Sequence, residues 1–148
     1  MTGPGKSGPL YVLAFHHAGG TGSLFSSWQH ALGSGVEVIP VRFPGRQRNG
    51  LSDRYTDMAS LVHALADDLE PILSRRHMFY GHSMGAMVAY LLTRRRTAGA
   101  QLPPERLIVG AAAAPCRTNL LSQTAALSDI ELAQWLIDVS GVPAEPLP

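Results

Sequence analysis

The fold is decided by the stretch MFYGHSMGA, residues 78–86. It holds the pattern Gly-x-Ser-x-Gly at Gly81, Ser83 and Gly85, between a short apolar run and a helix-forming run. The bare pattern arises by chance in roughly one chain in ten of this composition. A strand before it and a helix after it are, however, the setting in which a reactive serine is presented. We therefore predict a sharp, strained turn at Ser83 that exposes its hydroxyl beyond the end of a strand.

The residues around Ser83 fit this turn for physical reasons. Gly81 and Gly85 lack side chains that would collide with the neighbouring strand and helix. The first turn of the following helix has free N–H groups and the positive end of the helix dipole, which favour developing negative charge. One such donor is predicted to be the N–H of Met84, and a second donor is expected from the glycine-rich loop His17–Gly20.

Predicted strands and helices alternate outward from the turn. Strands are expected over residues 10–15, 36–41, 78–80 and 107–114, and helices over residues 23–32, 56–73, 84–97 and from 128 to about 140. This order predicts an α/β fold, with a parallel sheet, helices on both faces and right-handed crossovers. In the last helix, Ser128 and Glu131 form a capping box, and Leu127 can pack on Leu132.

Size and composition favour one globular domain. The chain has 148 residues, of which 45% are apolar and 16% charged, with a net charge of +1. The small net charge argues against a nucleic-acid partner. The strongest basic run, Arg94–Arg96, stands where a helix should end, and we interpret it as a solvated cluster that complements the helix dipole.

Compartment signals are few. The single cysteine, Cys116, cannot form an internal disulfide, so nothing indicates an oxidising compartment. No apolar run approaches the roughly 18–20 residues that a membrane span needs. Residues 1–9 are rich in Gly and Pro without an apolar core, which is typical of a flexible cytosolic N-terminus.

Four stretches together resemble one family, the stand-alone (type II) thioesterases of polyketide and nonribosomal peptide synthesis, which have the α/β-hydrolase fold. They are residues 15–20 (FHHAGG), 25–28 (FSSW), 41–46 (VRFPGR) and 81–86 (GHSMGA). The resemblance extends from about Leu10 to Pro143.

The resemblance implies roles for three residues. Ser83 would be the acyl-accepting nucleophile, with the backbone amides of Ala18 and Met84 as the oxyanion hole. The substrates would be acyl groups held as thioesters on the phosphopantetheine arm of an acyl or peptidyl carrier protein, from which the family removes aberrant units. The enzyme would be cytoplasmic, with no cofactor, metal, nucleic acid or membrane.

The resemblance also divides the chain. Residues 10–119 would be the N-terminal part of the hydrolase core, and residues 120–148 the start of a lid region whose first helix is Ser128–Val139. About four parallel strands are expected, whereas this fold continues to later strands that carry the catalytic acid and base. We therefore expect the chain to be an N-terminal fragment, with roughly a hundred residues absent.

A catalytic histidine is missing from the expected place. In this fold an acid and then a histidine follow the nucleophile in the chain, but all six histidines lie before Ser83, at positions 16, 17, 30, 63, 77 and 82. His17 is the least improbable substitute; the side chain of His82 should point away from that of its neighbour Ser83, and the other four are interpreted as structural or surface residues. Asp129 and Asp138 are expected to face solvent on the last helix. Without an activating base the chain should have little or no turnover.

Three readings stay open at this point: a thioesterase fragment, which we favour, a related serine esterase, lipase or acyltransferase, and a non-catalytic module that binds the acyl group or the carrier. A nucleotide site at Gly5-Lys6-Ser7 is dismissed because the motif precedes its strand. A metal site at His16-His17 is dismissed because adjacent residues rarely supply two ligands. The strand at 107–114 should expose an apolar edge, which favours poor solubility or association with itself or with a complementary piece.

Overall fold

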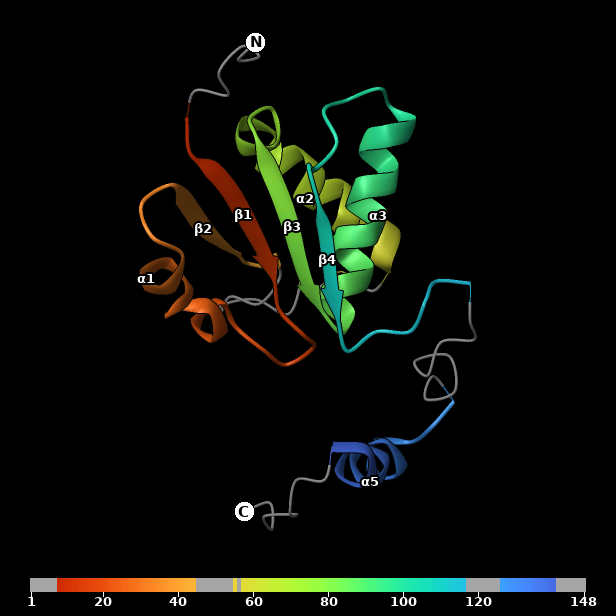
Figure 1. Ribbon diagram of the computed structural model, residues 1–148. Helices are drawn as coiled ribbons and strands as arrows, with labels where there is room; N and C mark the ends of the chain where they lie inside the picture. The colour runs from red at the N-terminus through yellow and green to blue at the C-terminus, as the bar shows by residue number, and fades with distance from the viewer. Residues whose placement is uncertain (1–7, 45–54, 56, 117–125, 141–148) are drawn as a thin grey trace. The chain divides into compact units, whose positions relative to one another are not determined.

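The computed structural model describes residues 8–44, 55, 57–116 and 126–140. It divides into two compact units, Met1–Ala112 and Ala113–Pro148, which are treated separately. The first unit is a parallel four-stranded sheet in the order β2-β1-β3-β4 (Figure 1). Its elements are β1 (Leu10–Phe15), the 3₁₀ helix η1 (Gly22–Phe25), α1 (Trp28–Leu32), β2 (Val36–Val41), α2 (Met58–Leu73), β3 (His77–His82), α3 (Met84–Ala98) and β4 (Leu107–Gly110). The second contains α5 (Asp129–Ser140).

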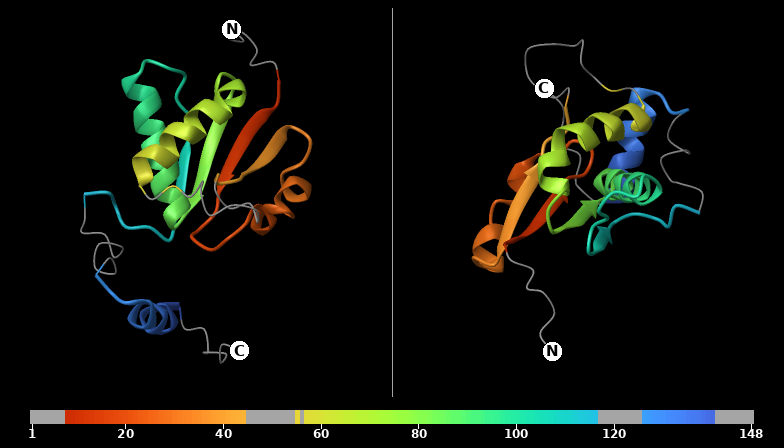
Figure 2. Two further views of the ribbon diagram at one scale, coloured as in Figure 1. Left: turned by 180° about the vertical axis from the view of Figure 1, so that it is seen from behind. Right: turned by 90° about the horizontal axis from the view of Figure 1, so that it is seen from above.

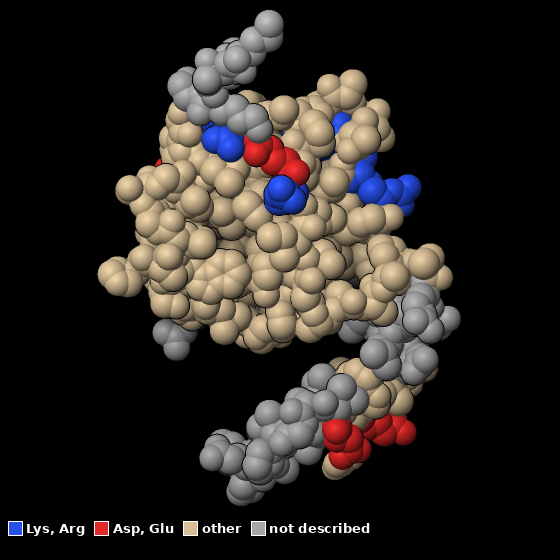
Figure 3. Space-filling view, viewed as in Figure 1, with Lys and Arg blue, Asp and Glu red and all other residues tan. Residues whose placement is uncertain are grey.

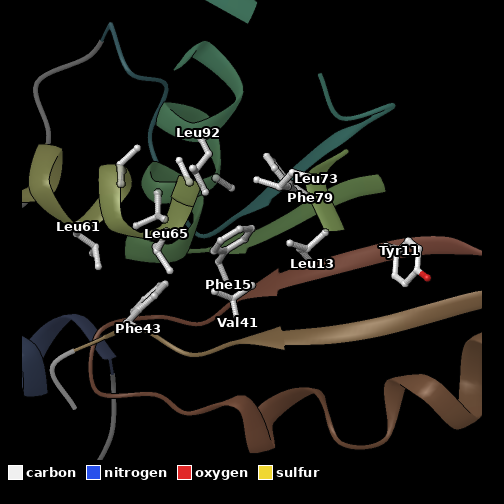
Figure 4. Close-up of a cluster of buried hydrophobic side chains, with 14 residues drawn as sticks. Tyr11, Leu13, Phe15, Val41, Phe43, Leu61, Leu65, Leu73, Phe79 and Leu92 are labelled. Carbon is white, nitrogen blue, oxygen red and sulfur yellow. The ribbon is translucent and has the colours of Figure 1, made fainter. Parts of the chain in front are cut away.

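Helices lie on both faces of the sheet, as the sequence predicts. Helices α2 and α3 cover one face, while η1 and α1 lie on the other, beside β1 and β2 (Figure 2). The larger core is between the sheet and α2 and α3, where Phe15 of β1 meets Phe79 of β3 edge-to-face at 5.4 Å (Figure 4). The sheet, its parallel pairing and its helices confirm the predicted fold class.

Helix α2 starts with a capping interaction. The Asp57 carboxylate accepts hydrogen bonds from the Ser60 N–H at 2.8 Å and the Ser60 hydroxyl at 2.7 Å. Ordered α-helix therefore begins at Met58. The predicted start at residue 56 lies outside the described residues. From this cap the apolar stripe of α2 runs onto the core through Leu61, Leu65 and Leu73.

Three predicted boundaries differ from the structure. The single helix expected over 23–32 is two short helical segments, because Ser26 and Ser27, which separate them, are weak helix formers. Strand β4 ends at Gly110 and not at residue 114, because Ala111 has a φ of +52° and leaves the extended conformation. Strand β3 is longer than predicted, at His77–His82, because it pairs with a neighbour on each side.

Arg96 corrects the interpretation of the basic run. Arg94 and Arg95 are exposed, but Arg96 is only 1% exposed. Its guanidinium donates to a carboxylate oxygen of Glu70 at 2.7 Å and to the carbonyl oxygens of Leu73 at 2.9 Å and Leu102 at 2.6 Å. Arg96 thus ties the end of α2 to α3 and to the loop that leads into β4.

Replacing Arg96 with methionine is expected to lower the free energy of unfolding by about 2–4 kcal/mol, because the buried Leu73 carbonyl and the partly buried Leu102 carbonyl lose their donor and the half-exposed Glu70 loses its counter-charge. Arg95→Ala is the matched control on the exposed side of the same helix turn, with a change within about 0.5 kcal/mol. Urea titrations monitored by circular dichroism measure both. Equal midpoints for the two variants would contradict the role given to Arg96.

Among the described residues, no helix is both long enough and apolar enough to cross a membrane. The predicted apolar edge is present, since Ile108 and Val109 of β4 are 45% and 52% exposed.

Both limits of the predicted lid region, residues 120 and 148, lie outside the described residues, because the structure does not describe residues 117–125 and 141–148. The described helix there, α5, begins with the predicted capping box, in which the Ser128 N–H donates to the Glu131 carboxylate at 2.9 Å.

Candidate active site

Ser83 occupies a strained turn between β3 and α3. Its backbone has φ +53° and ψ −116°, a region that residues with a side chain rarely adopt. Two hydrogen bonds hold the turn: the Ser83 N–H donates to the Gly110 carbonyl at 2.9 Å, and the Ala86 N–H donates to the Ser83 carbonyl at 3.0 Å. Ser83 is partly exposed. The predicted conformation at this residue is therefore present.

Both glycines of the motif are needed for close backbone approach. A Cβ atom at Gly81 would lie 2.5 Å from the Ala86 Cα. A Cβ atom at Gly85 would lie 2.5 Å from the carbonyl carbon of Phe15 and 2.6 Å from the carbonyl oxygen of His16. All these neighbours are backbone atoms and cannot move aside easily. Any side chain at either position would force strand and helix apart.

The Gly85 contacts also place the loop after β1 beside the first turn of α3. Within this loop the Gly20 N–H donates to the His17 carbonyl at 3.0 Å, which closes a turn. The His17 ring lies edge-on to the ring of His82, with centroids 5.9 Å apart. Two segments about sixty-five positions apart in the chain are thus neighbours at the carboxyl ends of β1 and β3, as the sequence predicts.

The two amides predicted to form an oxyanion hole, those of Met84 and Ala18, belong to these two segments. Met84 is the first residue of α3, so its N–H is one of the amides without a partner inside the helix. Ala18 is exposed in the loop, and its carbonyl accepts a hydrogen bond from His17 Nδ1 at 2.7 Å. This bond requires the proton on Nδ1, which leaves Nε2 of a neutral His17 as the basic nitrogen.

An aromatic cluster of Tyr80, Trp28 and Phe25 lies next to the turn; the sequence analysis quoted residues 25–28 but did not predict that they meet Tyr80. The Tyr80 ring packs against Trp28 at 4.7 Å and against Phe25 at 5.9 Å. The Tyr80 hydroxyl lies 3.5 Å from His82 Nδ1. The alternation of Tyr80 and His82 along β3 could have shown that both side chains share a face, but not that Trp28 meets them there.

The remaining histidines have structural or surface positions. His16 is buried and stacks on Phe43 at 4.4 Å, while His30 and His63 are exposed. His77 is fully buried at the start of β3; its Nδ1 donates to the Arg75 carbonyl at 2.8 Å, but its Nε2 has no hydrogen-bond partner. His77 is therefore a structural residue, as interpreted from the sequence, although one of its ring nitrogens is left without a partner. No group of three or more potential metal ligands occurs among the described residues.

Stability is expected to fall as pH drops below about 6.5 because of His77. Burial lowers the pKa of His77 in the folded chain; the Arg75 carbonyl and the charges of Arg96, Glu105 and Glu70 modify this effect. The unfolded chain, with a histidine pKa of about 6.5, then takes up a proton before the folded chain does. The contribution of His77 to stability is thus complete above that pH, and it decreases as pH falls toward the folded-state pKa.

Urea midpoints measured between pH 5.5 and 7.5 check this expectation. His77→Phe keeps an aromatic ring beside Phe79 and removes the titrating group, so its midpoint should depend less on pH. A pH dependence that is identical in both proteins would contradict the assignment.

Comparisons with known proteins agree with this geometry. The family model described as thioesterase domain matches residues 11–148. Linear gramicidin dehydrogenase LgrE of Brevibacillus parabrevis is 32% identical over 136 residues, which are 92% of this chain and 52% of LgrE. Gramicidin S biosynthesis protein GrsT of Aneurinibacillus migulanus is 28% identical over 134 residues, 90% of this chain and 52% of GrsT.

Among solved structures, RedJ, a thioesterase from the prodiginine biosynthetic pathway of Streptomyces coelicolor, matches with a TM-score of 0.77 and 34% identity. The match covers 96% of this chain and 55% of RedJ. The chain therefore spans about half the length of the relatives it matches.

Proposed function

The chain belongs to the thioesterase domain family, and we propose that it carries the nucleophile half of an active site that hydrolyses acyl thioesters on the phosphopantetheine arm of a carrier protein. The observation that supports this most is the backbone of Ser83, at φ +53° between a strand and a helix. Strain of this kind persists where the surrounding structure enforces it, as Gly81 and Gly85 do here. The names of a gramicidin S biosynthesis protein, GrsT, and a thioesterase from the prodiginine biosynthetic pathway, RedJ, support a biosynthetic thioester substrate.

The proposed reaction is acyl transfer to Ser83 followed by hydrolysis. The Ser83 oxygen attacks the thioester carbonyl and loses its proton to a base, and the N–H groups of Met84 and Ala18 stabilise the negative oxygen that forms. The carbon–sulfur bond breaks, and the pantetheine sulfur takes up a proton and leaves. Water then cleaves the Ser83 ester, which releases the carboxylic acid and restores the hydroxyl.

The base is the part that these residues do not supply. No histidine follows Ser83 in the sequence, so a polypeptide of these residues alone should be a weak catalyst. We also propose that residues 120–148 begin a lid over the acyl site. A cytoplasmic location belongs to the same proposal, since Cys116 has no cysteine in the chain to pair with.

The proposal is tested with a carrier protein that bears an acetylated phosphopantetheine arm. Mass spectrometry of the carrier should show slow loss of the acetyl group, faster than in buffer and dependent on Ser83, so that Ser83→Ala abolishes it. Binding of the acylated carrier without any loss that depends on Ser83 would favour the non-catalytic module. Ser83-dependent hydrolysis of an oxygen ester but not of the thioester would favour the esterase reading.

A further inference from the structure

The loop His17–Gly20 carries one of the two amides proposed for the oxyanion hole, and the two hydrogen bonds described within it are local. The Gly20 N–H donates to the His17 carbonyl at 3.0 Å, and His17 Nδ1 donates to the Ala18 carbonyl at 2.7 Å. Both bonds shape the turn without tying it to another element. Ala18 and Gly19 are exposed, and a Cβ atom on Gly19 would meet nothing within 4 Å. The position of the Ala18 amide therefore depends on what holds the loop from outside.

The side chain of His17 joins the loop to β3. Its ring lies edge-on to the ring of His82, with centroids 5.9 Å apart. Ring pairs attract each other in this arrangement and at this separation. The same His17 ring packs over Gly20, where an added Cβ atom would lie 3.2 Å from its Cε1 and 3.0 Å from Leu24 Cδ1. One ring thus touches both the loop's own backbone and the last residue of β3.

The ring of His82 is in turn supported by its neighbours. Its Nδ1 lies 3.5 Å from the Tyr80 hydroxyl, which is too long for a strong hydrogen bond and is mainly a packing contact. A Cβ atom at Gly110 would lie 3.4 Å from the same nitrogen, so the glycine leaves room for the ring. Tyr80 packs on Trp28 at 4.7 Å. A continuous row of rings therefore runs from Trp28 of α1 through Tyr80 and His82 to His17.

The charged groups of this face lie at the other end of the strands. Figure 3 shows the charged side chains of the first unit gathered near the amino-terminal ends of the strands. The ion pair of Arg76 and Glu105, at 2.7 Å, joins residues just before β3 and β4. At the carboxyl ends, the described side-chain contact between the loop and β3 is instead the pair of histidine rings.

We propose that His82 is a positioning residue: its ring supports the ring of His17 and so holds the Ala18 amide beside the Met84 amide. His82 acts through His17 and makes no contact with the substrate. The reason for holding the amide there rests on the proposed function, in which both amides stabilise the negative oxygen formed at Ser83. The support itself rests on the ring contacts alone.

Amide hydrogen exchange of the ¹⁵N-labelled chain, followed by NMR, tests the support. The Gly20 amide reports on the loop, because its hydrogen bond to the His17 carbonyl closes the turn. His82→Ala should make this amide exchange roughly three- to tenfold faster, since one ring pair is lost. The amides of β1, which is paired on both sides, are the internal reference and should exchange as in the parent.

Matched variants separate the ring from its polar atoms. His82→Phe keeps an aromatic ring and should restore the Gly20 exchange rate to within about twofold of the parent. His82→Asn keeps a polar group but no ring, and should behave as His82→Ala does. In a His17→Ala background, His82→Ala should cause no further acceleration, because the contact that it removes is already absent.

Reaction of Ser83 with a fluorophosphonate tests the consequence for the site. The phosphonyl oxygen would use the same two amides, so the rate of labelling should fall several-fold in His82→Ala and recover in His82→Phe. A loosened loop with an unchanged labelling rate would overturn the positioning role. If Ser83 of the parent is not labelled at all, the proposed function fails, and the Gly20 exchange still decides whether His82 supports the loop.

Three results of the exchange measurement would overturn the proposal. Unchanged Gly20 exchange in His82→Ala would mean that the ring does not hold the loop. Equal acceleration in His82→Phe would mean that the ring contact is not what matters. Acceleration that extends to β1 would mean that His82 supports the whole sheet and has no specific effect on the loop.

Discussion

A polypeptide of these 148 residues is expected to hydrolyse an acyl thioester on the order of 10⁶-fold more slowly than an intact serine hydrolase. The strained turn at Ser83 is in place, but a serine hydroxyl is a poor nucleophile until a base accepts its proton. The same base is needed again to activate the water that releases the acyl group. Rates for the chain and for RedJ on one acyl thioester measure the deficit.

His17 gives this prediction a sharp control. Its Nδ1 proton is held by the Ala18 carbonyl, which leaves Nε2 of the neutral ring free to act as a base. If the deficit holds, His17→Asn should change the small residual rate only modestly. A rate within about tenfold of RedJ, lost in His17→Asn, would show that this loop histidine replaces the missing one and that the expected deficit is wrong.

Gly85→Ala is expected to destroy the site and to lower the free energy of unfolding by more than about 4 kcal/mol. The added Cβ would lie 2.5 Å from the carbonyl carbon of Phe15 and 2.6 Å from the His16 carbonyl oxygen. Both atoms are backbone at the end of β1, so relief requires that β1 and α3 separate. That separation would also move the loop with Ala18 away from Met84.

Gly35→Ala is the matched control, because a Cβ there has no neighbour within 4 Å. It should change the free energy of unfolding by no more than about 1 kcal/mol. Urea midpoints of the two variants against the parent measure the difference. Similar midpoints for both would mean that the helix does not approach β1 as closely as described.

Local signals explain why much of the fold could be predicted from the sequence. The four strands are short apolar runs bounded by glycine, proline or polar residues, and α2 has a regular apolar stripe. Each of these features depends on neighbours in the chain. The ends of the elements were predicted less well, because a positive φ at Ala111 and pairing on both sides of β3 depend on the tertiary structure.

Arg96 shows what composition alone does not reveal. In the sequence it is the third member of a basic run, and such runs are usually solvated. Its burial depends on Glu70, twenty-six positions earlier, and on the Leu102 carbonyl in the next loop. Only the packing of α2 against α3 brings these groups together.

The candidate site, too, could be predicted from the sequence only in part. Ser83 and its two glycines could be predicted, because the turn is a local structure with a strict need for small residues. The contacts of His17 with His82 and of Tyr80 with Trp28 join segments that the sheet places side by side. The motifs FHHAGG, FSSW and GHSMGA contain His17, Trp28 and His82, but they do not show which rings meet.

The central claim, that the turn at Ser83 presents an acyl-accepting hydroxyl, is tested most directly by mapping where a fluorophosphonate reacts. Prolonged incubation followed by peptide mass spectrometry should place the adduct on Ser83 in preference to exposed serines such as Ser26 and Ser74, by roughly 10³-fold, because strain and backbone donors act even without a base. Ser83→Ala should remove the adduct. Modification spread evenly over the exposed serines, or unchanged in Ser83→Ala, would contradict the account.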